Sequence, residues 1–159
     1  MATKPTGQLY TSNPAGLKNL NVDAEIWQIT RGGLALPNAQ VKKNLSPSPE
    51  LFQTFVHEWK GKPFQQWWPK YEERFSSELE SSEKLRGLRD VYKNLLVGNN
   101  VVLVCFCKDH RYCHRRLVGE FFKPYNVNVV ELNPITQEQL SLFEGGERVN
   151  GNHNNNRFL

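Results

Sequence analysis

Hydrophobic residues along this chain follow two different spacings, and the alternation between them predicts the order of strands and helices. Residues 8–12 resemble a short strand, and residues 26–30 alternate apolar and polar side chains with a period of two. Residues 101–104 form a continuous run rich in β-branched side chains, which is typical of a strand covered on both faces. Residues 127–132 predict a further strand.

The first helix is marked by capping residues as well as by spacing. Residues 34–45 show no sustained period and are expected to form a loop. Ser48 then suits the N-cap position, and Pro49 suits the first helical position. Glu50 lies near the positive end of the helix dipole, which favours a carboxylate. We expect this helix to end near Lys60.

Further helices follow on each side of the buried strand. One is predicted for residues 63–79, although Pro69 lacks an N–H and predicts a kink or a new helix start beside it. Another is predicted for residues 82–96, and Gly98 is placed to end it in a left-handed conformation. A last helical pattern begins at Leu117.

Strands that alternate with helices predict an α/β fold, with a mainly parallel sheet flanked by helices in a Rossmann-like arrangement. The 159 residues, of which 38% are hydrophobic and 23% charged, fit one domain with an adequate core. We expect this single domain at residues 1–143, with a short helix near residues 137–143. Residues 144–159 are rich in Gly and Asn and are expected to form a mobile tail.

Composition limits the cell compartment and the kinds of partner that we expect for the protein. No apolar run approaches the roughly 20 residues that a membrane-spanning helix needs, and residues 1–7 lack the apolar centre of a secretory signal. We therefore expect a cytoplasmic protein with reduced thiols and no membrane partner. The net charge of +4 is compatible with a phosphate-bearing partner but does not identify a nucleic-acid binder. The sequence leaves the oligomeric state open.

The segment between the buried strand and the last helix is chemically the densest of the chain. Residues 101–118 hold all three cysteines, two of the four histidines and three arginines. The polar residues follow the carboxyl end of a strand, where open α/β sheets bind ligands. Cys113, His114 and Arg115 fall at or near the first turn of a helix, where unpaired N–H groups attract anions. The pattern predicts a phosphate or carboxylate site.

A reactive thiol is the first candidate chemistry. Cys113 lies where a helix dipole and the neighbouring His114 and Arg115 would stabilise a thiolate, so it is a candidate nucleophile. A small buried thiol of purely structural use is the alternative. His114 is a candidate acid or base. Cys105, at the end of an apolar strand, is expected to pack.

Metal binding is the second candidate. Cys105, Cys107 and Cys113 with one histidine, His110 or His114, could supply a tetrahedral zinc site. The cysteines lack the paired Cys-x-x-Cys spacing, so we predict no metal and no other cofactor.

An anion cradle is the third candidate. If neighbouring parallel strands bring the turn at Arg31 beside Cys113, basic side chains could converge on one phosphate. The alternative is that Arg31 or Arg115 pairs with a structural carboxylate, such as Glu78 or Asp109. The predicted ligand-binding residues are Thr11, Ser12, Arg31, Lys108, Arg111 and Arg115.

Aromatic side chains form a set that could stack on bases or build the core. Helical spacing favours core packing. Nearby lysines could contact phosphates or simply be solvated. The aromatic residues are Trp59, Trp67, Trp68 and Tyr71, and the lysines are Lys42, Lys43, Lys60, Lys62 and Lys70.

The stretch from Cys105 to Arg115, Cys-Phe-Cys-Lys-Asp-His-Arg-Tyr-Cys-His-Arg, resembles the hallmark of domain of unknown function 488, the YeaO-like proteins. That hallmark has a Cys, a Lys three positions later and then Cys-His-Arg opening a helix. Weaker similarities lie in Tyr10-Thr-Ser, Leu17-Lys-Asn-Leu, Thr30-Arg-Gly, Leu45-Ser-Pro-Ser and Arg74-Phe-Ser-Ser-Glu-Leu, so the resemblance extends over about residues 8–132. Many members have Glu where this chain has Cys107. The resemblance implies an α/β fold and no settled activity.

These observations favour an enzyme, a hydrolase or transferase, that acts on a phosphate-containing substrate such as a nucleotide or nucleic acid. Two alternatives remain open at this point. One is a non-catalytic module that binds nucleotide or nucleic acid, and the other is an accessory protein that binds a host partner.

Overall fold

A computed structural model describes residues 4–136 and residue 139. The predicted tail at residues 144–159 and, apart from Gln139, the predicted helix at residues 137–143 lie outside the described residues. No helix in the described part of the chain combines the length and the apolar character needed to cross a membrane.

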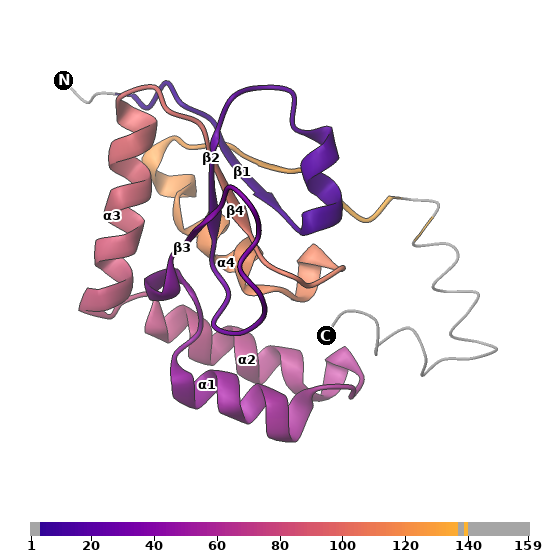
Figure 1. The fold of residues 1–159 in the computed structure, drawn as a ribbon. Helices are drawn as coiled ribbons and strands as arrows, with labels where there is room; N and C mark the ends of the chain where they lie inside the picture. The colour runs from indigo at the N-terminus through magenta and orange to yellow at the C-terminus, as the bar shows by residue number, and fades with distance from the viewer. Residues whose placement is uncertain (1–3, 137–138, 140–159) are drawn as a thin grey trace.

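The centre of the protein is a five-stranded parallel sheet, as the α/β prediction required (Figure 1). Its spatial order is β3-β2-β4-β1-β5, so the buried strand β4 is central. The two-residue strand β3 lies within the predicted loop at 34–45 and was not predicted, because both of its side chains are exposed. The strands are β1 (Leu9–Ser12), β2 (Glu25–Gln28), β3 (Gln40–Val41), β4 (Val101–Val104) and β5 (Val129–Glu131).

The helices follow the predicted capping signals closely. Ser48 accepts a hydrogen bond from the N–H of Leu51, with Pro49 in the first turn, and Gly98 has the left-handed φ of +93° that was expected of it. Pro69 lies inside one continuous helix, so the predicted new start beside it is wrong. The helices are α1 (Pro49–Thr54), α2 (Phe64–Glu78), α3 (Ser82–Leu96) and α4 (His114–Phe121). A π-helical segment, Phe55–Trp59, extends α1.

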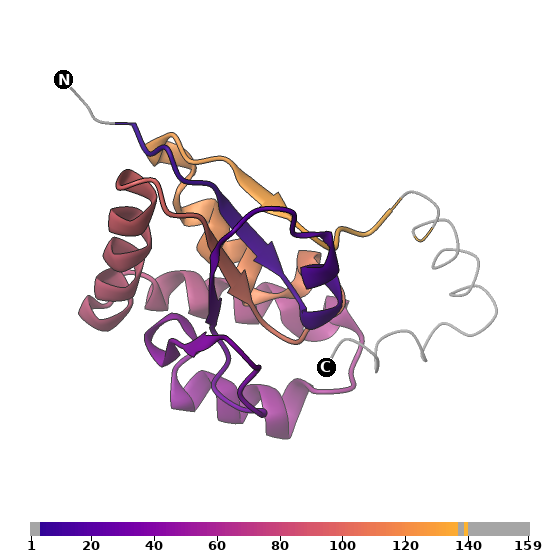
Figure 2. The same cartoon turned by 45° about the horizontal axis from the view of Figure 1, so that its top comes forward.

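The layers explain why β4 is a continuous apolar run. Val101 and Leu103 pack into the larger core beneath the helices. Val102 and Val104 pack on the opposite face with Leu17, from the 3₁₀ turn Pro14–Asn19. Figure 2 shows that turn standing apart from α2 and α3 across the sheet.

The aromatic residues of the helical layer are core residues, as their spacing favoured. Trp67 stacks on Trp59 with ring centroids 6.1 Å apart, and Tyr71 stacks on Trp68 at 5.5 Å. All four side chains are buried. This cluster joins the π-helical segment to α2, and it packs against the helix α4 that carries the chemically dense segment.

Candidate functional site

The carboxyl ends of β2 and β4 lie side by side, and the site is built where the chain leaves them. The parallel pairing aligns Gln28 with Val104, and the N–H of Ile29 donates to the Val104 carbonyl at 2.9 Å. The turn that contains Arg31 therefore faces the segment that contains Cys105 and Cys113, which is the juxtaposition that parallel strands predicted.

Between these segments lies a cavity of about 310 Å³. Its lining includes the three cysteines and His114, and Arg31 and Lys60 contribute cationic groups. Aromatic rings supply most of the remaining wall. The lining residues that matter below are Arg31, Phe52, Lys60, Phe106, Tyr112 and Cys113.

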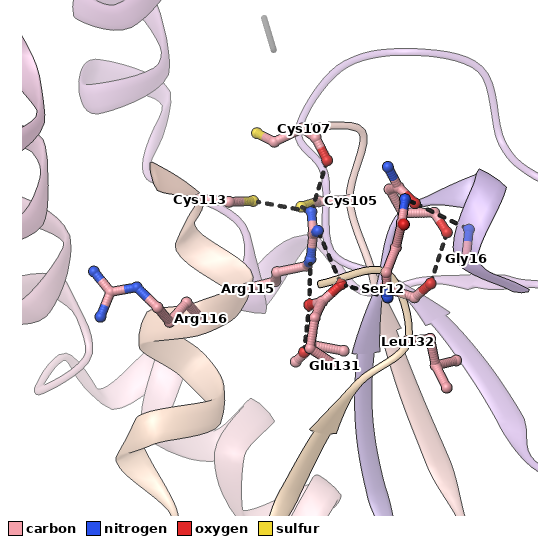
Figure 3. A network of polar contacts seen from close by, with 12 residues as sticks. Ser12, Gly16, Cys105, Cys107, Cys113, Arg115, Arg116, Glu131 and Leu132 are labelled. Carbon is pink, nitrogen blue, oxygen red and sulfur yellow. Dashed lines mark hydrogen bonds and ion pairs between the residues drawn. The ribbon is translucent and has the colours of Figure 1, made fainter. Parts of the chain in front are cut away.

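Two sulfur atoms and one backbone carbonyl contact the Arg115 guanidinium beside this cavity (Figure 3). Arg115 donates from Nη1 to the Sγ atoms of Cys105 and Cys113, at 3.3 and 3.6 Å. The same nitrogen donates to the Cys107 carbonyl at 2.8 Å. Cys107 also lines the cavity. All three cysteines are free.

Arg115 is itself held from below by a carboxylate. Its Nε and Nη2 donate to the two oxygens of Glu131 at 2.9 and 3.1 Å. The Thr11 hydroxyl and the N–H of Asn133 donate to the same carboxylate, at 2.8 and 3.0 Å. The guanidinium therefore cannot swing towards the cavity without giving up several hydrogen bonds.

The thiol pKa values follow from this arrangement. Burial alone would raise the pKa of Cys113, but hydrogen bonds from Cys105 and Cys107 and the charge of Arg115 hold that pKa well below its ordinary value. Hydrogen bonding to the other two thiols raises the pKa of Cys107 well above its ordinary value, and burial raises the pKa of Cys105. Of the three thiols, Cys113 is therefore the one that loses its proton most readily.

His114 is a buried, neutral imidazole. Its Nε2 lies 2.7 Å from the Ile29 carbonyl, which can only accept, so Nε2 carries the proton. Burial lowers the pKa of the ring. The His114 ring also makes an edge-to-face contact with Phe75, at a centroid distance of 5.4 Å.

Cys105, Cys113 and His114 could also be considered as metal ligands, because one ligand atom from each lies within 4.8 Å of the others. The guanidinium of Arg115 already contacts both sulfurs, and His114 Nε2 already donates to a carbonyl. A cation in this position competes with a metal ion for the same sulfur lone pairs. The contacts therefore favour thiol chemistry at this cluster.

Two hydrogen bonds to backbone carbonyls hold the Arg31 side chain at the cavity. Its Nε donates to the Pro47 carbonyl at 2.7 Å, and Nη2 donates to the Lys43 carbonyl at 3.4 Å. These bonds go to backbone oxygens, so they hold the guanidinium without neutralising its charge. Arg31 is half-buried and lines the cavity.

Five of the six predicted ligand-binding residues are not part of the cavity wall, and one of them is Arg115, which is bound to Glu131. Thr11 is engaged with Glu131, and the buried Ser12 hydroxyl donates to the Asn13 carbonyl. Arg111 makes two hydrogen bonds to Asp109, at 3.0 and 2.7 Å. Lys108 is exposed. The structure thus brings Arg31, Cys113 and His114 together and keeps the other cationic side chains of the segment outside the cavity.

The carboxylates that the sequence suggested as partners of Arg31 or Arg115 bind other residues. Arg115 pairs with Glu131 instead of Glu78 or Asp109. Glu78 instead accepts from the N–H of Ser48 at 2.8 Å and pairs with the buried Lys84 at 3.4 Å. The carboxylate of Asp109 belongs to Arg111.

Sequence reasoning missed Glu131, the residue on which the thiol cluster rests. The available signal was a single charged residue inside the apolar run of β5, which indicates a carboxylate with a buried partner. Lys60 was one of five lysines expected either to contact phosphates or to be solvated, and its position on the cavity wall depends on the π-helical segment that ends beside it.

Comparisons with known proteins agree with the hallmark noted in the sequence. Neither the curated proteins nor the solved structures gave a match. A family model described as the active DUF488-N3 subclade matches residues 9–126, a range that runs from β1 through the whole of α4. Because that match covers most of the chain and includes the three cysteines, His114 and Arg115, the protein belongs to the DUF488 family.

Proposed function

We propose that this protein is an enzyme that uses the Cys113 thiolate on a phosphate-containing substrate of nucleotide type. The observation that carries the proposal is the Arg115 guanidinium, held between the sulfurs of Cys105 and Cys113 directly beneath a cavity. A buried thiol with a lowered pKa is costly to maintain for packing alone, and perturbed nucleophiles in cavities are typical of active sites.

The chemistry is a displacement at sulfur in two steps. The Cys113 thiolate attacks an electrophilic centre of the substrate, and the leaving group departs with the electron pair of the broken bond. Water or a second acceptor then displaces the sulfur and regenerates the thiolate. These steps describe a hydrolase or a transferase, respectively.

His114 is suited to proton transfer during these steps. Because its Nε2–H donates to the Ile29 carbonyl, the other ring nitrogen, Nδ1, carries the lone pair of the neutral imidazole. A neutral ring can accept the proton of an attacking water and return it to a leaving group. His114 lines the cavity, so it has access to a bound substrate.

The two cationic side chains in the cavity are an argument that the substrate carries a phosphate. Arg31 and Lys60 both line the cavity, and the backbone bonds of Arg31 leave its charge uncompensated. Arginine is suited to two-point contact with phosphate oxygens. Arg31 would therefore bind the anion, while Arg115 acts through the thiolate as a positioning residue.

The aromatic side chains of the cavity are an argument that the substrate also carries a flat ring. Phe52, Phe106 and Tyr112 line the cavity, and its volume of about 310 Å³ falls within the usual range for small-molecule sites. Aromatic side chains stack on nucleobases with little regard to base identity. A mononucleotide, or the end of a nucleic-acid strand, combines the two features.

The experiment is protection of Cys113 from alkylation. Iodoacetamide would label the protein with and without inorganic phosphate or a panel of ribonucleoside monophosphates, and peptide mass spectrometry would follow Cys113. We expect a nucleotide to protect Cys113 and the Arg31→Gln variant to lose that protection while keeping its alkylation rate. Arg89→Gln removes the same charge from an exposed position on α3 and is expected to behave like the wild type.

Turnover is tested on the same panel by phosphorus and proton NMR, with Cys113→Ser as the control protein. Product formed by the wild type and not by Cys113→Ser supports an enzyme. Protection of Cys113 without turnover of any protecting nucleotide would instead identify a non-catalytic binding module. If no member of the panel protects Cys113, the nucleotide assignment is wrong.

A further inference from the structure

Two of the three thiols lie together at one cation. The Sγ atoms of Cys105 and Cys113 are within 4.8 Å of each other. Both accept a hydrogen bond from Nη1 of Arg115, at 3.3 and 3.6 Å. Both cysteines are buried, and both line the cavity. A displacement reaction needs one nucleophilic sulfur, so the second sulfur has no part in the proposed function.

Cys107 is placed differently from this pair. Arg115 donates to its carbonyl at 2.8 Å, and Figure 3 shows that carbonyl, rather than the sulfur, facing the guanidinium. Cys105 is therefore the cysteine that the geometry pairs with Cys113. A disulfide bond is about 2.05 Å long, so rotation about the Cα–Cβ bonds has to bring the two sulfurs together before they bond.

The cavity beside this pair of cysteines is positively charged. Of the described residues that line it, Arg31 and Lys60 carry positive charges and none carries a carboxylate. Backbone carbonyls hold Arg31, so its charge is available to an anionic ligand. A small molecule that reacts with the two thiols from this cavity is thus expected to be an anion.

We propose that the protein is also a dithiol oxidoreductase, in which Cys113 exchanges with a small disulfide that carries carboxylates and Cys105 resolves the mixed disulfide. This inference rests on the reactive Cys113 of the proposed function, but it needs no nucleotide.

The reaction balances in two exchange steps. The Cys113 thiolate attacks one sulfur of the small disulfide, whose S–S bond breaks, and the first thiolate leaves with the electron pair and takes up a proton. The Cys105 thiol then loses its proton and attacks the Cys113 sulfur, which releases the second small thiolate. The products are a Cys105–Cys113 disulfide and two small thiols. The protein has lost two electrons, the small disulfide has gained them, and a dithiol reductant reverses the change.

The local charges favour this order of attack. Burial raises the pKa of the Cys105 thiol, and the negative charge of Cys113 raises it further. The mixed disulfide removes the charge of Cys113, while Arg115 Nη1 remains in contact with the Cys105 sulfur. Cys105 therefore gives up its proton more readily after Cys113 has reacted than before.

The oxidised site leaves no buried charge without a partner. Formation of the disulfide removes one anionic partner of Arg115, the Cys113 thiolate. The two bonds of Arg115 to Glu131, at 2.9 and 3.1 Å, and its bond to the Cys107 carbonyl do not involve a thiol. The guanidinium thus keeps its counter-ion in both redox states, and we expect the same fold in both.

Intact-protein mass spectrometry provides the test. The full chain is reduced, freed of reductant and mixed with dithiodiglycolate, a small disulfide with two carboxylates. We expect the wild type to become two hydrogen atoms lighter and to recover its mass on addition of dithiothreitol. Trypsin cuts after Lys108 and Arg111, so digestion without reductant should give the peptide of Cys113 cross-linked to the peptide of Cys105.

Two variants identify the resolving cysteine, because Cys105 and Cys107 share one tryptic peptide. Cys105→Ser is expected to stop at the mixed disulfide, with one thioglycolate on Cys113. Cys107→Ser is the matched control and is expected to keep the cross-link. Cys105→Ala serves the same purpose if the serine variant does not fold. A cross-link that persists without Cys105, or a wild type that forms none, would overturn the proposal.

The charge of the small disulfide tests the role assigned to the cavity. The rate of mixed-disulfide formation is measured with dithiodiglycolate, with uncharged hydroxyethyl disulfide and with cystamine, which carries two ammonium groups. The ratio of wild-type to Arg31→Gln rates cancels the intrinsic reactivity of each reagent. We expect a ratio of about ten for dithiodiglycolate, because a charge-assisted hydrogen bond is lost, and about one for hydroxyethyl disulfide.

Arg89→Gln is the matched control for this ratio, because it removes the same charge from an exposed position on α3. It is expected to give a ratio of about one with every reagent, since Arg89 does not line the cavity. Equal ratios for the anionic, neutral and cationic disulfides in Arg31→Gln would overturn the assignment of an anionic substrate.

Alkylation separates this proposal from the proposed function. Rapid alkylation of Cys113 at neutral pH, together with no cross-link, overturns the oxidoreductase and leaves the Cys113 nucleophile standing. Alkylation of Cys113 no faster than that of free cysteine overturns both. A cross-link together with no protection of Cys113 by any nucleotide supports the oxidoreductase and shows that the nucleotide assignment is wrong.

Discussion

Arg115 and Glu131 form a two-bond ion pair inside the protein, joining the first turn of α4 to the end of β5. Nε lies 2.9 Å from Oε1, and Nη2 lies 3.1 Å from Oε2. The arginine side chain is fully buried and the glutamate is 12% exposed. Because water cannot replace either partner, the pair fixes the guanidinium whose remaining nitrogen contacts the thiols.

Loss of this carboxylate should destabilise the whole domain. Glu131→Gln leaves Arg115 buried without its counter-ion, and breaking a buried pair in this way typically costs about 3–5 kcal/mol. We expect a decrease of that order in the free energy of unfolding, measured by urea denaturation at neutral pH.

Glu72→Gln is the control for charge removal at a surface pair. Glu72 pairs with Arg116 at 3.2 Å, and both side chains are solvent-accessible. Such pairs contribute about 0–1 kcal/mol. Equal decreases in the free energy of unfolding of the two variants would show that the buried Arg115–Glu131 pair stabilises the fold no more than a surface pair does.

Local sequence patterns predicted most of the fold because they report burial directly. The apolar run at β4, the N-cap of α1 and the terminating Gly98 after α3 each have their own physical cause, and all were confirmed. The strand β3 carried no such signal, since two exposed residues at a sheet edge need no apolar pattern. Of the two alternatives at Pro69, a kink or a new helix start, the new start is wrong, because the buried aromatic residues on both sides of Pro69 hold α2 in one piece.

The site was predictable only where it depended on neighbouring parallel strands. The turn at Arg31 and the segment at Cys113 meet because β2 pairs with β4, which the strand-end argument anticipated. The partner of Arg115 depends on the order β4-β1-β5, which places Glu131 beyond β1. No local pattern encodes that order, so the sequence left open whether Arg115 binds a ligand or a structural carboxylate, and it did not identify Glu131 as the carboxylate.

The pH dependence of Cys113 reactivity should depend on the shape of the Arg115 side chain. The wild-type rate of iodoacetamide alkylation is expected to reach its half-maximum well below the ordinary thiol pKa of about 8.5. Arg115→Lys keeps the positive charge but cannot reach both sulfurs and Glu131 at once, so we expect the midpoint to move up towards that value.

Arg116→Lys is the matched control for this shift. Arg116 is the next residue of α4, and it points away from the thiols towards Glu72 and Glu120 (Figure 3). Its variant should keep the wild-type midpoint. A profile for Arg115→Lys that coincides with the wild type would mean that the guanidinium geometry does not set the thiolate.

Acid should weaken the fold through His114. Burial lowers the pKa of this ring in the folded protein, whereas in the unfolded chain the ring titrates near its ordinary value of about 6.5. Below that value the unfolded chain binds more protons, so stability is complete above about pH 6.5 and decreases as the pH falls towards the lower folded pKa. Urea midpoints at a series of pH values would measure the decrease.

His114→Gln should make that decrease shallower, because the amide does not titrate and can still donate towards the Ile29 carbonyl. His110, whose pKa is also lowered by burial, continues to titrate in this variant, so part of the slope is expected to remain. His57→Gln is the matched substitution, because it alters an exposed histidine on the π-helical segment and leaves the buried ring in place. Identical slopes for His114→Gln and the wild type would contradict a neutral buried ring.

Gly33 should control the entrance to the cavity as well as local stability. It has a φ of +88°, and a Cβ at this position would lie 2.6 Å from the Phe106 ring. Gly33→Ala therefore combines the left-handed penalty of about 1–2 kcal/mol with a displacement of that ring. Gly98→Ala meets a similar φ of +93° but only Thr6 Oγ1 at 3.4 Å, so it isolates the backbone penalty.

The two variants should consequently differ in a property of the cavity. Both are expected to lower the urea midpoint, but only Gly33→Ala should change the alkylation rate of Cys113, because Phe106 and Cys113 line the same cavity. The measurement is the ratio of alkylation rates, variant to wild type, under conditions in which both variants are fully folded. If the ratio is the same for Gly33→Ala and Gly98→Ala, the Phe106 ring does not control access to Cys113. The proposed role of Phe106 in substrate binding would then be wrong.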